Sequence, residues 1–171
     1  METWDAIRSR RNVREFSDQP VPVGQLDQIL EAGRRAPSAK NIQPWDFIVV
    51  TDRDRLAELT GVWQGAWHVA GSQAAVAFVV PVIEPGRWAD LARFDLGHAV
   101  MAMMLMAADL GLGTGHASVE DQDLARQILG LPEDRTCAFL VSIGYPADRP
   151  IKVIVKPNRR PFDEVVHREQ W

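Results

Sequence analysis

The chain has 171 residues and a formal net charge of −4 at pH 7, with 46% hydrophobic and 25% charged residues. This length and balance are typical of one globular domain, so we expect a single domain over residues 1–171 and no long disordered region. The acidic balance supplies no positive field to attract nucleic acid or a membrane surface, and we expect neither as a partner.

Several classes of site lack the residues they need. Cys137 is the only cysteine, which excludes a disulfide framework or a thiolate metal cage within one chain. The four histidines have no H-x-x-x-H or H-E-x-x-H spacing, so we expect no metal site. No serine lies in G-x-S-x-G, which leaves covalent hydrolysis without a nucleophile. The N-terminus METWDAIRSRR does not resemble a secretory signal, so we expect a cytoplasmic protein.

The first half of the chain predicts alternating helices and strands. Leu26, Ile29, Leu30 and Gly33 follow the i, i+3, i+4, i+7 spacing of an amphipathic helix that ends before Pro37. Two runs are apolar on successive residues, as in strands that are covered on both faces. The predicted elements are helices at 3–10, 23–36 and 52–61 and strands at 46–50 and 74–82.

The second half begins with a Met-rich helix from Trp88 to Leu110. Its most apolar part, 96–108, is too short to cross a bilayer, so we expect a buried helix. The remaining predicted elements are a glycine stop at 111–116, a helix opened by a Ser118–Asp121 capping box and ending at Leu129, a strand at 136–146, a short β-like run after Lys152 and a brief helix from Pro161. This order indicates mixed α and β structure around one sheet.

The glycines of GLGTGH do not form a dinucleotide-binding loop. That fingerprint needs G-x-G-x-x-G between a strand and a helix, whereas here the third glycine falls one residue early and a helix precedes. We therefore interpret them as a helix stop, whose following backbone amides could still face a ligand.

Two basic turns lie at opposite ends of the chain. RSRRNVREF places Arg8, Arg10, Arg11 and Arg14 within seven positions, and a second turn holds Lys156, Arg159 and Arg160. Such runs are often only a solvated surface. If the two turns meet, however, guanidinium forks would bind one phosphate dianion bidentately, a ligand small enough for a few contacts.

A polar turn precedes the first predicted strand. APSAKNIQPWDFIVV carries Ser38, Lys40, Asn41 and Gln43 between a helix and a strand. Short polar side chains and backbone amides at such a turn suit the edge of a flat heterocycle. The alternative is a turn whose amides only satisfy the local backbone.

Four stretches in this order, RSRRNVREF, RAPSAKNIQPWDFIVV, GLGTG and NRRPFDEVVH, resemble the nitroreductase family of FMN-dependent NAD(P)H oxidoreductases. The resemblance covers nearly the whole chain. It implies an α+β, three-layer α-β-α sandwich with a central mixed sheet flanked by helices and a long buried central helix. It also implies a homodimer with FMN sites at the subunit interface.

The resemblance also implies which residues hold FMN. Arg10, Arg11, Asn12 and Arg159 match positions at the ribityl phosphate, with Arg14 and Arg160 as weaker matches, and Asn12 stands where the family usually has serine. The matches near the flavin ring are Arg35, Pro37, Ser38, Ala39, Asn41 and Gln43, with the backbone of Ser118 and Val119 near N5 and O4. Lys40 or Arg14 could place a charge near N1 and O2, and no side chain is expected to be catalytic.

The implied reaction is a ping-pong cycle in which hydride passes from NADH or NADPH to FMN and then to a nitroaromatic, quinone or related small acceptor. The short segment PVIEPGRWADLARF leaves little chain for a substrate lid. Alternatives are oxygen-dependent flavin cleavage, reductive dehalogenation, a non-catalytic FMN carrier, or a polyanion-binding protein without flavin. The Met-rich helix independently favours a dimer, because it is apolar nearly all round, although a buried core helix would look the same.

Overall fold

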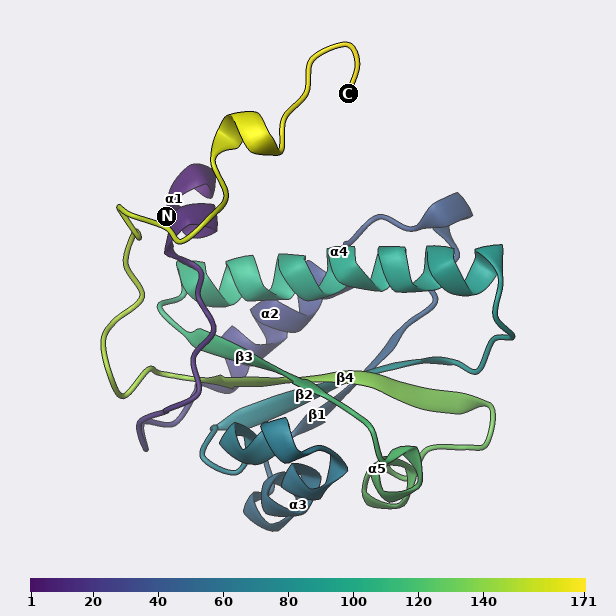
Figure 1. Ribbon diagram of the computed structural model, residues 1–171. Coiled ribbons are helices and arrows are strands. Elements are labelled where there is room, and N and C mark those ends of the chain that lie inside the picture. The colour runs from purple at the N-terminus through teal and green to yellow at the C-terminus, as the bar shows by residue number, and fades with distance from the viewer.

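The computed structural model describes residues 1–171 and places a four-stranded sheet between two layers of helices (Figure 1). The α-helices are α1 (Thr3–Ser9), α2 (Val23–Arg34), α3 (Arg53–Glu58), α4 (Arg87–Asp109) and α5 (Gln122–Leu129). The strands are β1 (Asp46–Val50), β2 (Ala74–Pro81), β3 (Gly113–Ser118) and β4 (Arg135–Gly144). Short 3-10 helices are η1 (Ala39–Asn41), η2 (Leu59–Val62), η3 (Gln64–Val69) and η4 (Phe162–Glu164).

The sheet has the order β1-β2-β4-β3, and every neighbouring pair of strands is antiparallel. The expectation of a mixed sheet is therefore wrong for these four strands. The one parallel pairing is an isolated bridge between Asn12 and Thr114 at the outer edge of β3. The expected α+β sandwich of three layers is confirmed.

Helices cover both faces of the sheet. The helices α2 and α4 lie on one face, and α3, α5, η2 and η3 lie on the other (Figure 1). On the first face Leu96 and Met103 pack in one core with Phe78, and on the second Leu56 and Leu140 belong to a separate core. The predicted burial of β2 on both faces is thereby confirmed, because alternate side chains enter different cores.

The long helix α4 is the central helix predicted from residues 88–110. By length and composition it could cross a membrane, yet much of it is buried inside the fold. Ala99, Met104 and Ala107 are buried and lie in the core shared with α2 and the sheet. Gly33 of α2 allows this close packing, because a Cβ there would lie 2.2 Å from the Met103 methyl group. The helix is thus a core element, as expected.

The segment after α4 is the main departure from the sequence-based expectation. Gly111 does end the helix, with a left-handed φ of 77°, but Gly113–Ser118 then continues as strand β3 rather than as a helix stop. A glycine-rich run has low strand propensity, so its packing against neighbouring segments must explain why it forms a strand. A Cβ on Gly113 would lie 2.5 Å from Val13 Cγ2, so the strand needs glycine to accept residue 13 alongside it.

Two further expectations need correction. Ser118 ends β3 and caps nothing, whereas the Asp121 carboxylate alone caps α5 by accepting a hydrogen bond from the Leu124 amide at 2.9 Å. The run after Lys152 forms no strand; instead the Ile154 amide donates to the Arg8 carbonyl at 3.1 Å. The capping box therefore fails at its serine, which the sheet holds in β3, and Ile154 of the tail pairs with the end of α1 instead of with a strand.

Gly115 offers a test of the packing at the edge of β3. A Cβ at this position would collide with the Val13 carbonyl oxygen and would lie 2.9 Å from Ser142 Oγ. We expect Gly115→Ala to lower the free energy of unfolding by about 1–3 kcal/mol. Gly24→Ala is the control, because nothing lies within 4 Å of that position in α2, and it should be neutral or stabilising by up to about 1 kcal/mol. Denaturant unfolding at one protein concentration measures both, and equal stabilities would contradict the packing.

Candidate functional site

Residues 10–14 run along the open edge of β3. The Val13 amide donates to the Thr114 carbonyl at 2.8 Å, and Asn12 forms the parallel bridge with Thr114. Val13 itself is buried, which fixes the backbone on both sides of it. The arginines that flank this segment are therefore held by the sheet rather than by a flexible arm.

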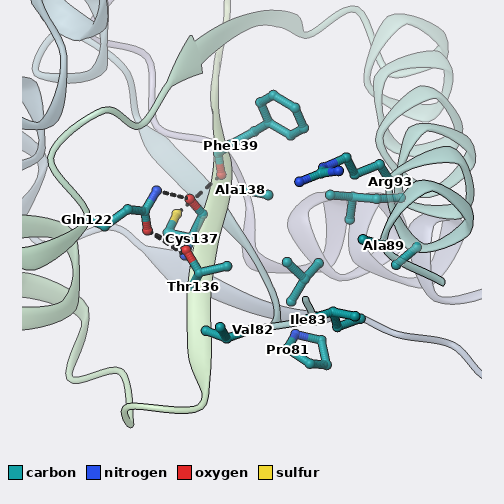
Figure 2. A pocket seen from close by; sticks show the side chains of 13 residues that line it. Pro81, Val82, Ile83, Ala89, Arg93, Gln122, Thr136, Cys137, Ala138 and Phe139 are labelled. Atoms are coloured by element: carbon teal, nitrogen blue, oxygen red, sulfur yellow. Dashed lines mark hydrogen bonds between the residues drawn. The ribbon is translucent and has the colours of Figure 1, made fainter. Parts of the chain in front are cut away.

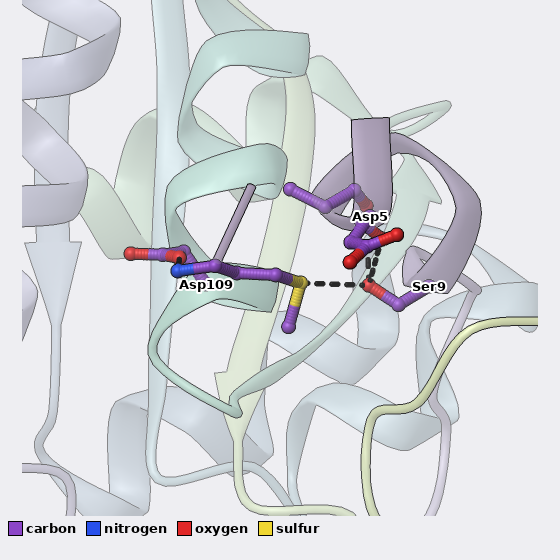
Figure 3. Close-up of polar contacts among 5 residues, drawn as sticks. Asp5, Ser9 and Asp109 are labelled. Atoms are coloured by element: carbon purple, nitrogen blue, oxygen red, sulfur yellow. Dashed lines mark hydrogen bonds and ion pairs between the residues drawn. The ribbon is translucent and has the colours of Figure 1, made fainter. Parts of the chain in front are cut away.

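Contacts with α4 hold the helix that precedes this segment. The Met1 ammonium pairs with the Asp109 carboxylate at the end of α4, which raises the pKa of the N-terminus. Ser9 is buried, and its hydroxyl donates to the Asp5 carbonyl at 2.7 Å and contacts the Met1 sulfur at 3.4 Å (Figure 3). Helix α1 is thereby attached to α4, and Arg10 emerges at its C-terminal end.

The C-terminal tail meets the same place. The hydrogen bond from Ile154 to the Arg8 carbonyl brings the tail beside the end of α1, and Figure 1 shows the tail rising next to α1. Burial lowers the pKa of Arg10, and the positive charge of Arg159 lowers it further. The two basic turns predicted at opposite ends of the chain therefore come together.

The charges in this region are positive and unbalanced. Arg10, Arg14 and Arg159 form no ion pair, although most other arginines in the chain do. Burial, followed by Arg10, His68 and Arg14, lowers the pKa of the nearby His116. Arg14 lines a cavity with Glu15 and Asp148, whereas Arg10 and Arg159 act on each other with no carboxylate between them and have the charge and donors that a phosphate dianion requires. A phosphate ester fits this arrangement.

Other predicted arginines are engaged elsewhere. Arg11 donates to the Asp148 carboxylate and to the Arg149 carbonyl, each at 2.7 Å, and this bond lowers the pKa of Asp148. Arg160 donates to the Glu164 carbonyl at 2.9 Å within the short tail helix. These partners leave Arg11 and Arg160 weaker phosphate candidates than Arg10 and Arg159, which the sequence could not distinguish.

Arg35 is also paired. It donates to the Glu31 carboxylate at 2.6 Å, and Arg34 donates to the same group, so the pKa of Glu31 falls to about 2. The backbone of Arg35 and Ala36 closes the end of α2, and Pro37 then starts the polar turn.

The polar turn around η1 is held in an unusual backbone conformation. Lys40, Asn41 and Gln43 have φ of 52°, 56° and 53°, in the left-handed region that non-glycine residues rarely adopt. The Ser38 hydroxyl accepts from the Gln43 amide at 2.9 Å, and the Gln43 side chain donates to the Asn41 carbonyl at 3.1 Å. The two amide side chains are exposed, so the strained turn presents them outward.

Asp95 anchors this turn, a role that the sequence did not reveal. Its carboxylate, buried in α4, accepts from the Ala39 amide at 2.9 Å. Lys40 lies above the Trp88 ring, 5.3 Å from the ring centre. The only sequence signal was an acid at the start of the most apolar part of the helix, and its partner lies 56 residues earlier in the chain.

The turn and the arginines lie at opposite parts of α4 (Figure 1). Asp95 holds the turn and Asp109 holds the N-terminus, and about four helical turns, or about 21 Å, separate these two positions. Within one chain the two predicted parts of the flavin site are therefore not brought together.

The backbone at Ser118 and Val119 is braced by Gln122, another residue missed from sequence. The Gln122 side-chain amide donates to the Val119 carbonyl at 3.1 Å and to the Cys137 carbonyl at 2.9 Å, and its oxygen accepts from the Thr136 hydroxyl at 2.6 Å. This bridge fixes the chain where β3 ends. The only local sign of this role in the sequence was a glutamine three residues after Val119.

His68 braces the middle of the same strand. Its buried ring lies 2.9 Å from Ser142 Oγ through Nδ1 and 3.0 Å from the His116 carbonyl through Nε2. Burial lowers its pKa, and Arg14 adds to this effect, whereas the hydrogen bond to His116 opposes it. A neutral His68 thus ties η3 to β3 and β4 directly beneath the arginine segment.

A cavity of about 360 Å³ opens between α4 and the ends of β2 and β4 (Figure 2). It is mostly apolar, with Arg93 as its one charged residue. Phe139, which pairs with Ser118, and Gln122 are in its lining, but none of the residues predicted to hold FMN is. Cys137 also lines it, and burial raises the pKa of its thiol to about 12, so the thiol is unreactive.

Comparisons with known proteins place the chain in a family. The model of the Nitroreductase family matches residues 7–82 and again 62–145. A Thermus thermophilus protein named NADH dehydrogenase is 31% identical, covering 97% of this chain and 95% of its own. A Vibrio harveyi NADPH-flavin oxidoreductase is also 31% identical, covering 99% of this chain and 74% of its own.

A solved structure agrees with these matches. The Vibrio harveyi NADPH:FMN oxidoreductase, in complex with NAD+, superposes with a TM-score of 0.84 and 26% identity, covering 99% of this chain and 77% of that one. The ordered motifs, the sandwich fold and the family match lead to one conclusion: the chain belongs to the nitroreductase family.

Proposed function

We propose that this chain is an FMN-dependent NAD(P)H oxidoreductase that reduces small organic acceptors, among them nitroaromatics and quinones, by a ping-pong mechanism. The convergence of Arg10 and Arg159 beside β3, with no carboxylate near them, is the observation that carries the proposal. The family match and relatives named NADPH-flavin oxidoreductase and FMN reductase support the same activity. When bound, FMN supplies the hydride chemistry between the nicotinamide and the acceptor.

The residues divide into two binding roles. Arg10, Arg14 and Arg159 would hold the phosphate, with Asn12 at the strand edge between the first two. The backbone of Ser118 and Val119, fixed by Gln122, would position the ring edge. The strand-edge segment and the Ser118–Val119 backbone are both held in place without a ligand. Binding would therefore cost little conformational entropy, which favours affinity.

The outward amides of Asn41 and Gln43 would complete the ring site from the η1 turn. Lys40 is on this turn, whereas Arg14 lies beside β3 in a cavity with Glu15 and Asp148, so Lys40 is the better candidate for the charge near N1 and O2. A fixed cation there would stabilise negative charge that develops on the ring. The exposed chain between β2 and α4 leaves the acceptor side open, consistent with several small acceptors.

Anaerobic absorbance spectroscopy tests the activity. We expect the purified protein to be yellow, to lose its flavin absorbance when NADH or NADPH is added, and to recover it when a nitroaromatic or a quinone follows. A flavin that stays oxidised with both donors would identify a carrier instead. A colourless protein that gains no flavin absorbance when FMN is added would contradict the proposal and favour a polyanion-binding surface.

Two adjacent arginines give a matched test of the phosphate site. Arg159→Ala should weaken FMN binding by about 1.5–3 kcal/mol, the range for a hydrogen bond to a charged group. Arg160→Ala should have a much smaller effect, because that side chain already binds Glu164. Fluorescence titration of the flavin-free proteins measures both affinities, and equal losses would refute the assignment.

We also propose that two chains form the complete site as a homodimer. Asp95, which holds the η1 turn, and Asp109, which holds the N-terminus, are about 21 Å apart along α4, so a second copy would bring its turn to the first copy's arginines. The outward face of α4 carries Phe94 and Met101, which are 66% and 45% exposed. His98, between them, has a buried Nδ1 without a hydrogen-bond partner. An apolar stripe with one unsatisfied polar atom suits a protein interface.

Phe94→Glu tests the dimer, because a charge in an apolar interface is costly. We expect the unmodified chain to form a species of twice 19.1 kDa in light scattering, and the variant to dissociate and lose flavin. Gln127→Glu adds the same charge on α5, in the opposite layer, and should leave the dimer intact. A wild-type monomer that retains flavin would overturn the shared site.

A further inference from the structure

Asp95 is the only charged side chain that is buried in the long helix α4. It is 5% exposed and forms no ion pair. A buried carboxylate loses its hydration, so it needs a hydrogen-bond donor from the protein. That donor is the Ala39 amide, at 2.9 Å. The buried acid thus serves the η1 turn and no salt bridge.

The other hydrogen bonds of the η1 turn do not attach it to the rest of the fold. The main-chain amides of Asn41, Ile42 and Gln43 and the side-chain amide of Gln43 all donate to acceptors within residues 38–41. The bond from the Ala39 amide to Asp95 is the one hydrogen bond that leads from the turn to another helix or strand. The position of the turn relative to α4 therefore depends on this bond.

Packing beneath the turn does not replace the hydrogen bond. A cavity of about 60 Å³ lies between the turn and α4, and Asp95 is its only charged lining residue. Ile42 and Pro44 line the cavity from the turn, and Trp88 and Leu91 line it from the helix. An empty space forfeits the contacts that close packing would supply. Apolar contacts alone would thus leave the turn loosely placed.

The conformation of the turn also needs support. Lys40, Asn41 and Gln43 have left-handed φ values, which non-glycine residues adopt at a cost in free energy. Such strain persists where the surrounding structure fixes it, and it is typical of ligand sites. The exposed side-chain amides of Asn41 and Gln43 are the groups proposed to meet the flavin ring.

We propose that Asp95 is a positioning residue for the flavin ring. Its hydrogen bond to the Ala39 amide holds the η1 turn where the side-chain amides of the turn meet the ring edge, and Asp95 itself does not touch the flavin. This inference rests on the proposed function. In the proposed homodimer, the ring concerned belongs to the flavin whose phosphate the second chain holds.

Hydrogen exchange of the flavin-free, full-length protein tests the local part of the proposal. In the wild type, NMR should show a protected Ala39 amide beside a rapidly exchanging Lys40 amide, which has no hydrogen-bond partner in the chain. This readout needs no variant to fold. Equal exchange rates for these two amides would overturn the role of Asp95.

Variants at the same position separate the hydrogen bond from the charge. Asp95→Ala should speed the exchange of residue 39 by about tenfold or more, whereas Asp95→Asn keeps an acceptor oxygen and should stay near the wild type. Asp90→Ala is the matched control, because that acid is also on α4 but is exposed and reaches only Arg93, at 3.7 Å. If Asp95→Asn behaves like Asp95→Ala, the hydrogen bond is not the cause.

The bound flavin reports the effect on the ring. At saturating FMN, Asp95→Ala should lower the flavin reduction potential and slow reduction by NADH or NADPH by about tenfold or more, because the ring-edge amides are misplaced. Arg159→Ala should instead weaken FMN binding and leave the potential of the bound flavin unchanged. A normal potential in Asp95→Ala would refute the role of Asp95 alone, whereas a wild type that binds no FMN would refute the proposed function.

Mixed dimers test whether Asp95 acts across the interface. An Asp95→Ala chain and an Arg159→Ala chain, each with its own affinity tag, are purified as one dimer. If the turn of each chain serves the phosphate site of the other, one site of this dimer contains neither change and the other contains both. We expect one site to bind and reduce flavin like the wild type. Two equally impaired sites would overturn the action on the second chain's flavin.

Discussion

The approach of Arg10 and Arg159 without a counterion is the constraint on which the rest of the structure depends. Like charges repel, and the charge of Arg159 adds to burial in lowering the pKa of Arg10. The backbone must therefore hold them together. It does so through the Val13–Thr114 and Ile154–Arg8 hydrogen bonds, both between main-chain groups that no change of charge disrupts. A bound anion would relieve this repulsion, which supports the proposed phosphate site.

Helix α4 sets the spacing of the whole arrangement. Its buried face joins the sheet to α2, while Asp95 fixes the η1 turn and Asp109 fixes the N-terminus. A single rigid helix thus determines the distance between the ring-edge amides and the arginines. Since that distance separates them within one chain, the same helix that organises the fold also makes a second copy the natural completion of the proposed site.

The supports of the site are neutral and buried. His68 binds the His116 carbonyl in the middle of β3, Gln122 binds the Val119 carbonyl just after its end, and neither needs to carry a charge to do so. This division is physically reasonable, because buried neutral hydrogen bonds fix geometry at little electrostatic cost. The charged groups are left at the strand edge, where a ligand can reach them. The η1 turn is also held by hydrogen bonds. The Ser38 hydroxyl and the Asp95 carboxylate keep the backbone of Lys40, Asn41 and Gln43 in its left-handed conformation.

By itself the sequence determined the layers of the fold and the identity of the basic turns. Hydrophobic periodicity is local, so α2, β1, β2, α4 and β4 were predicted close to their observed bounds. Strand β3 was not, because its glycines are explained only by the approach of Val13, about a hundred residues earlier in the chain. Only the tertiary structure decided which arginines stay unpaired, since Arg11 and Arg160 differ from Arg10 and Arg159 in their neighbours and not in their chemistry. Asp95, His68 and Gln122 escaped notice for the same reason: each acts through a partner brought near by folding.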